Sequence, residues 1–450
     1  MYDNMENKAN IEGDNNIVIQ GVQDSSITLN IRGNEEIIDK KLDQLIEIVR
    51  KLADEKALVQ FGNKSVPLRE LSKANFNYHL GRLNFDNQLP LDLREDLVTD
   101  KSKWLLSLKQ DLVLAGINVG NRPSEIIKHY GWVIEAHLQK MQTPIGKQDS
   151  LRRLSFMVEA YHSSVRYLCF IQLAQLAALD LKIDTVPTYR FFTLSEKEQS
   201  QFDYTELLIN ITNSLSVSKK ELFIPEITNF VHELTDTYQD LYTTSLFLEH
   251  HRSQFLAGLI TDDEDLHRLL DEFLTALAFW LRKLSFIGRY RLISVKDIQV
   301  DYRLKTEKSF IHLYGELHGM YNEMDVSDVD EDYQTVSMKD KFTYNRSILL
   351  LKGHIQGSVF SEYLSLTPFL IDNSVFTEKP TQTPEVYYYH SISSERRQYN
   401  YALYKNELGE NISSNKLLRI KVQNNGQPKL NVLFKHIEDI KNILNKGVEV

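Results

Sequence analysis

The sequence predicts an α+β protein in which short N-terminal strands precede a long helical region and a β-rich C-terminal region. Three observations support this fold class. Residues 16–31 alternate polar and β-branched residues, residues 68–288 repeat apolar residues at helical spacing, and residues 289–404 contain tyrosine-rich alternating runs. We therefore expect five parts, namely a β-hairpin leader at 1–33, a coiled-coil helix at 34–60, an α-helical domain at 61–288, a β-rich domain at 289–410, and a final strand and helix at 411–450.

Two short runs near the N-terminus have the alternation that is typical of strands, Asn16–Gln20 and Ser26–Ile31. Gly21 and the segment 23–25 (Gln-Asp-Ser) supply turn residues between them, so a hairpin is predicted. Because two strands alone are marginally stable in water, the apolar positions should be covered by another copy of the segment or by a partner chain.

A heptad pattern follows the predicted hairpin. Its apolar residues alternate spacings of four and three, which predicts the a/d seam of a coiled coil over about two heptads. Such a seam is short for an autonomous coiled coil, so we interpret hairpin and seam together as an association segment. The alternative is that both fold onto the core of the same chain. The predicted contact residues are Ile17, Ile19, Ile27, Leu29, Ile31, Ile38, Leu42, Leu45, Val49 and Leu52.

The residues Gly13–Gln20 (GDNNIVIQ), followed by Ser25–Ile31 (SSITLNI), resemble the short leader of prokaryotic conflict and antiviral defence proteins. In that group the leader precedes effector-associated adaptor domains, STAND-type NTPases, caspase-like peptidases or other modules. The resemblance implies a biological context and brings no catalytic residue with it. No G-x-x-x-x-G-K-[ST] phosphate loop occurs in the sequence, so a STAND-type NTPase is not expected within this chain.

Length and composition set wider limits. The chain has 450 residues, enough for two or three domains, and its 42% apolar and 25% charged residues are ordinary for a globular protein. A net charge of −10 disfavours a general nucleic-acid binder. The single cysteine, Cys169, excludes an intrachain disulfide and fits a reducing compartment. With no secretory signal and no spanning segment recognised, we expect a cytoplasmic protein without a membrane partner.

Helix and strand boundaries can also be predicted. A helix over 94–115 should end at Gly116, and the pattern over 152–181 is apolar nearly all round, which predicts a long central buried helix. Further helices are expected at 204–215, at 224–259 with a break, and at 262–287, followed by separate strands at 290–295 and 298–304.

The candidate chemical residues mostly favour structural roles. Cys169 and His162 share a helix face, but two turns of helix separate them, so core packing is predicted for both. The acidic run 323–332 lacks the glycine and glutamate that an EF-hand loop needs, and the histidines and carboxylates of 249–271 contain no H-E-x-x-H. We therefore predict no catalytic residue, no metal site and no cofactor.

One aromatic and basic stretch has two interpretations. Tyr387, Tyr389, Arg396 and Arg397 are candidate nucleic-acid contacts, because aromatic rings between arginines can stack on unpaired bases. Tyrosine-rich strands produce the same pattern without a ligand.

Together these features favour a non-catalytic, oligomerising sensor, adaptor or scaffold component of a prokaryotic antiviral system. Its partner would be a second copy or an effector protein. One alternative is an effector enzyme, a hydrolase or nuclease whose site is assembled from distant residues. Another is a nucleic-acid sensor, which requires the rings of 387–404 to be exposed on one face.

Overall fold

A computed structural model gives the fold of part of the chain. The described residues are 16–22, 25–30, 58–61, 64–67, 103–148, 150–181, 186–196, 198–199, 202–218, 220–260, 264–301, 309–317, 334–338, 346–352, 362–376, 384–393, 398–403, 419–423 and 428–445. The chain divides into two compact units, the first formed by 1–58 and 67–70 and the second by 59–66 and 71–450. The architecture is α+β, with a helical middle and a β-rich C-terminal region, as predicted.

The N-terminal hairpin predicted from the sequence is present. Strands β1 (Asn16–Val22) and β2 (Ser25–Asn30) pair antiparallel as a separate two-stranded sheet. A second two-stranded sheet joins β3 (Leu58–Phe61) and β4 (Lys64–Pro67).

The helical region begins with helix α3, which ends where the sequence predicted. Gly116 adopts a φ of 83°, the left-handed conformation that glycine reaches without strain. The Ile117 N–H donates to the Leu112 carbonyl and the Gly116 N–H to the Val113 carbonyl, closing a Schellman-type cap. The first elements are α3 (Lys103–Leu114), α4 (Pro123–Ile127), the 3₁₀ helix η5 (Lys128–Tyr130), α5 (Trp132–Gln142) and α6 (Pro144–Gln148).

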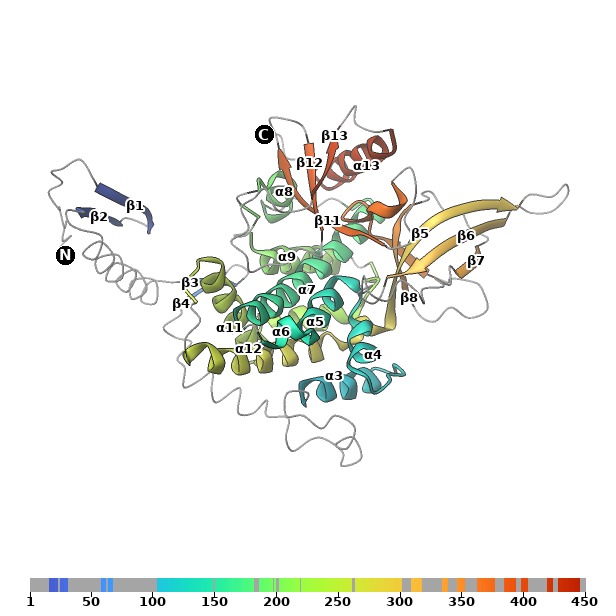
Figure 1. The fold of residues 1–450 in the computed structure, drawn as a ribbon. Helices are drawn as coiled ribbons and strands as arrows, with labels where there is room; N and C mark the ends of the chain where they lie inside the picture. Colours follow the sequence, from blue (N-terminus) through green and yellow to red (C-terminus); the bar gives the residue numbers. More distant parts are fainter. Residues whose placement is uncertain are drawn as a thin grey trace. The chain divides into compact units, whose positions relative to one another are not determined.

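Helix α7 (Ser150–Ala178) is the long buried helix that the sequence predicted. It packs against α5, α6, α9, α11 and α12, so it forms the axis of the helical array (Figure 1). The interval predicted as 224–259 is indeed broken, into α10 and α11. The remaining helices of the array are α8 (Val186–Thr193), α9 (Tyr204–Val217), α10 (Glu226–Thr235), α11 (Asp240–Leu256), α12 (Glu264–Lys283) and the 3₁₀ helix η7 (Ser285–Arg289).

A five-stranded antiparallel sheet follows the helices, in the order β7-β6-β5-β8-β9. Its central strand β5 is continuous, whereas the sequence predicted two strands. The register shifts between Val295 and Asp297, which shows that a bulge absorbs the break in alternation. The strands are β5 (Tyr290–Asp301), β6 (Ser309–Glu316), β7 (Gln334–Met338), β8 (Ile348–Lys352) and β9 (Glu362–Ser365).

A four-stranded antiparallel sheet, β10-β11-β12-β13, completes the C-terminal region, and helix α13 packs against β13 (Figure 1). The C-terminal strand thus belongs to the same sheet as the tyrosine-rich strands. These elements are β10 (Leu370–Asp372), the 3₁₀ helix η8 (Asn373–Val375), β11 (Val386–Ser393), β12 (Gln398–Leu403), β13 (Arg419–Gln423) and α13 (Pro428–Asn445).

A buried carboxylate joins the two larger sheets. Asp372 of β10 accepts hydrogen bonds from Ser294 Oγ (2.7 Å) and from Lys296 Nζ (2.6 Å) of β5. It also accepts the N–H of Ser374 and of Glu385, both at 3.0 Å. The side chains of Asp372 and Lys296 are only 1% and 7% exposed, so the two charges are paired away from water.

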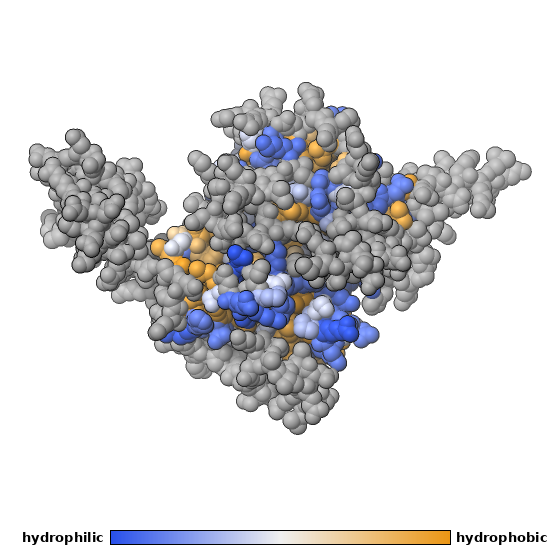
Figure 2. All heavy atoms as spheres, viewed as in Figure 1, coloured by the Kyte–Doolittle hydropathy of each residue, from blue (hydrophilic) through white to orange (hydrophobic). Residues whose placement is uncertain are grey.

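The viewed face of the second unit is mixed in polarity. Figure 2 shows hydrophilic residues across the central helical part, with smaller hydrophobic areas beside them. Among the described helices, none combines the length and the apolar content that crossing a membrane requires.

The Asp372→Ala substitution should lower the free energy of unfolding by about 3–5 kcal/mol, because it leaves the Lys296 ammonium buried without its charge partner. Glu362→Ala removes the ion pair that Glu362, 58% exposed, makes with Lys352, and should cost less than about 1 kcal/mol. Urea unfolding followed by circular dichroism measures both. Equal losses in the two variants would contradict the joining role of Asp372.

Candidate functional site

The hairpin β1–β2 places four of the five predicted strand contacts on one face. Ile17 lies opposite Leu29 and Ile19 lies opposite Ile27 in the antiparallel register. Directly paired residues share a face, and successive residues alternate between faces. The other face therefore carries the register pairs Val18 with Thr28 and Gln20 with Ser26. One face of the ribbon is aliphatic in sequence and the other is mainly polar.

The rest of the predicted association segment is not part of the described residues. Ile31 and the seam positions Ile38, Leu42, Leu45, Val49 and Leu52 all lie outside them. The predicted seam stays a prediction.

The tyrosines of the predicted nucleic-acid contact are core residues. Tyr387 and Tyr389 of β11 are buried, as are Tyr399 and Tyr401 of β12. The Tyr389 ring lies 5.2 Å from the Phe191 ring between their centroids, so it packs on helix α8. These rings form no exposed stacking surface, and that part of the expectation is corrected. Arg396 and Arg397 lie outside the described residues.

Cys169 and His162 are packed in the core, as predicted. The Cys169 thiol donates to the Tyr204 carbonyl at 3.1 Å, and burial raises its pKa well above the ordinary value. The His162 ring meets the Tyr204 ring edge to face, and burial together with Arg166 and Arg252 lowers its pKa well below the ordinary range. Both groups are therefore uncharged near neutral pH.

Histidine and acidic side chains are the groups that could ligate a metal ion. Within the described ranges, no three or more histidine, cysteine, aspartate or glutamate side chains converge as a metal site. The acidic run 323–332 and Asp262 and Asp263 lie outside these ranges.

A cluster of buried charged groups surrounds the middle of α7, and sequence analysis missed it. The Arg166 guanidinium carbon lies 4.1 Å from the Tyr388 ring centroid and 5.5 Å from that of Tyr204, between a strand and a helix. On the neighbouring helix, Arg252 donates to the Glu249 carboxylate at 2.6 Å. In sequence, Arg166 is 38 positions from Tyr204, 86 from Arg252 and 222 from Tyr388, so no local motif could have revealed the cluster.

Asp203 lies at the edge of this cluster and caps helix α9. Its Oδ1 accepts the Glu206 N–H at 2.9 Å, while its Oδ2 is buried without a hydrogen-bond donor among the described residues. Burial raises the pKa of Asp203 to about 7, and the nearby Glu249 and Glu206 carboxylates add to the rise against the backbone hydrogen bonds. Asp203 therefore changes charge near neutral pH.

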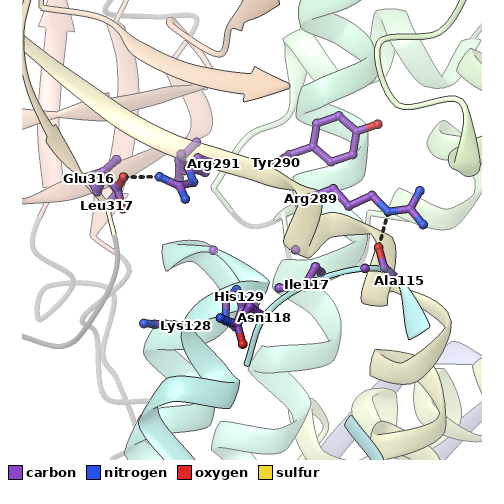
Figure 3. Close-up of a pocket in the computed structure, with 14 residues that line it drawn as sticks. Ala115, Ile117, Asn118, Lys128, His129, Arg289, Tyr290, Arg291, Glu316 and Leu317 are labelled. Carbon is purple, nitrogen blue, oxygen red and sulfur yellow. Dashed lines mark hydrogen bonds and ion pairs between the residues drawn. The ribbon is translucent and has the colours of Figure 1, made fainter. Parts of the chain in front are cut away.

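A cavity of about 600 Å³ opens where the helical array meets the five-stranded sheet (Figure 3). Its walls are the segment after α3, the helix η5, the start of β5 and the end of β6. Gly288 also lines it, and a Cβ at this position would clash with Ile117 Cδ1 at 2.5 Å. Figure 3 shows Lys128 and His129 on one side of the space and Arg291 and Glu316 on the other.

Comparison of the chain with protein-family models, with curated proteins and with solved structures found no match.

The pKa of Asp203 predicts a pH-dependent stability. Because the folded pKa of about 7 lies above the unfolded value, the folded state binds the extra proton, and stability should fall as pH rises from about 4 to about 7. Asp203→Asn should keep the helix cap and remove this dependence. Relative to the wild type, the free energy of unfolding of Asp203→Asn should therefore be higher at pH 8 than at pH 5, by about 1–3 kcal/mol.

Urea unfolding at several pH values measures this difference. Asp236→Asn, at the partly exposed end of α10, serves as the control for removing a carboxylate in general. Parallel pH profiles of the wild type and Asp203→Asn would contradict the assignment.

Proposed function

We propose that the chain is an oligomerising sensor or adaptor component of a prokaryotic antiviral system, acting in the cytoplasm through assembly rather than catalysis. The observation that carries this proposal is the hairpin β1–β2, a two-stranded sheet in a compact unit separate from the helical array. The leader resemblance of the same residues supplies the biological context.

The energetics of the hairpin favour assembly with a second copy. A two-stranded ribbon is marginal in water, and its four aliphatic register positions, Ile17, Ile19, Ile27 and Leu29, fall on one face. An identical ribbon from another copy offers the same aliphatic face, and a self-complementary patch of this kind is what a two-fold interface uses. Burial of aliphatic residues on both sides would contribute the stability that one ribbon lacks.

The burial of the tyrosines argues against the alternative function of a nucleic-acid sensor. That function requires exposed tyrosines in residues 387–404, and Tyr387, Tyr389, Tyr399 and Tyr401 are buried. The assembly function does not depend on these rings.

The assembly function predicts that light scattering of the full chain gives a multiple of 52.4 kDa. The double substitution Ile19→Glu with Ile27→Glu should reduce the mass to that of one chain, because it places two carboxylates on the aliphatic face. The matched control is Val18→Glu with Thr28→Glu, which puts two carboxylates on the directly paired positions of the other face and should leave the mass unchanged.

Two results would contradict this function. A wild-type mass of one chain excludes self-association, and dissociation by both double substitutions excludes the assignment of the aliphatic face as the contact.

A further inference from the structure

The cavity between the helical array and the five-stranded sheet differs in charge from the chain as a whole. Its charged lining residues are Lys128, Arg289, Arg291 and Glu316, three cations against one carboxylate, in a protein of net charge −10. A concave surface of one sign concentrates its field and attracts oppositely charged small molecules.

The two arginines are held in place by neighbours in the fold. Arg291 donates to Glu316 at 2.9 Å across β5 and β6. Arg289 donates to the Ala115 carbonyl at 2.9 Å (Figure 3). It also donates to Glu226 of α10 at 2.7 Å. Their positions are therefore set before a ligand arrives, which reduces the entropy cost of binding.

Among the cations that line the cavity, Lys128 makes the fewest interactions with the rest of the fold. Its side chain is exposed, and within the described part of the chain its ammonium group takes part in no hydrogen bond or ion pair. It lies on the opposite side of the space from Arg291 and Glu316 (Figure 3). A lysine in this position is available to an incoming anion.

The inner wall of the cavity is apolar. Ile117, Leu292 and Leu317 line it and are largely buried. A volume of about 600 Å³ falls within the range of small-molecule sites, which combine apolar walls with a few fixed polar groups.

We propose that this cavity binds a small organic anion. Its phosphoryl or carboxylate group lies between Lys128 and Arg291, and its less polar part packs on Ile117 and Leu292. This site is distinct from the hairpin, and the proposal does not depend on assembly.

The test is isothermal titration of the full chain at constant ionic strength with three probes, AMP, adenosine and inorganic phosphate. AMP should bind with a dissociation constant below about 1 mM, and at least about tenfold more tightly than adenosine, which lacks the anion, or phosphate, which lacks the organic part. Lys128→Ala should weaken AMP binding about tenfold, and Lys128→Glu should weaken it further. Lys435→Ala, on the exposed side of α13, is the matched control and should bind as the wild type does.

Three results would overturn the proposal. They are no saturable AMP binding up to about 10 mM, equal binding of AMP and adenosine, and unchanged AMP affinity in both Lys128 variants. Phosphate binding as tightly as AMP would overturn the organic part of the proposal. Repeating the AMP titration with the Ile19→Glu, Ile27→Glu chain separates this outcome from any failure of assembly.

Discussion

The burial of helix α7 is the constraint on which the rest of the second unit depends. A helix enclosed along most of its length must find partners inside the protein for the polar side chains it carries, because leaving such a group unpaired costs about 1–3 kcal/mol. Ser164 accepts from Trp280 of α12 at 2.7 Å, and Gln172 accepts from Thr212 of α9 at 2.9 Å. Gln175 holds the chain before α10 through the Glu221 carbonyl and the Phe223 N–H. The polar groups of α7 thus fix where its neighbours lie.

The same helix connects the helical array to the sheets. The Phe170 ring stacks on Phe369 at 5.7 Å between centroids, just before β10, and Arg166 lies over Tyr388 of β11. Asp372, the last residue of β10, pairs with Lys296 of the other sheet. Apolar contact supplies most of the stabilisation at this junction, and the directional hydrogen bonds of Asp372 determine which strand meets which.

The features that depend on local sequence patterns could be predicted from the sequence. Helix α7, the glycine cap at Gly116 and the hairpin β1–β2 each follow from a periodic pattern or from one residue with a special backbone conformation. The continuity of strand β5 could not be predicted in this way, because the bulge near Lys296 breaks the alternation of residues on which strand prediction depends. Where apolar periodicity is the only signal, an inserted residue looks like the end of an element.

The burial of the tyrosines and the presence of the charged cluster could not be predicted from the sequence, for a different reason. Alternation predicts a strand face but does not say whether a helix covers that face, and α8 covers Tyr389. The cluster around Arg166 combines α7, the start of α9 and β11, so its existence depends on tertiary contacts between segments with no shared pattern. The cavity likewise could not be predicted, because its cations come from three separate elements, η5, η7 and β5.

The position of that cavity follows from the passage between helical and β structure. At the start of β5, just after η7, Tyr290 and Leu292 are buried, Arg291 is partly exposed, and all three line the cavity. Arg289 is held by Ala115 and Glu226. The anion proposed for this cavity would contact both the helical array and the sheet, and it would stabilise the second unit by mass action. The assembly proposed for the hairpin would act differently, because it would raise the local concentration of neighbouring second units.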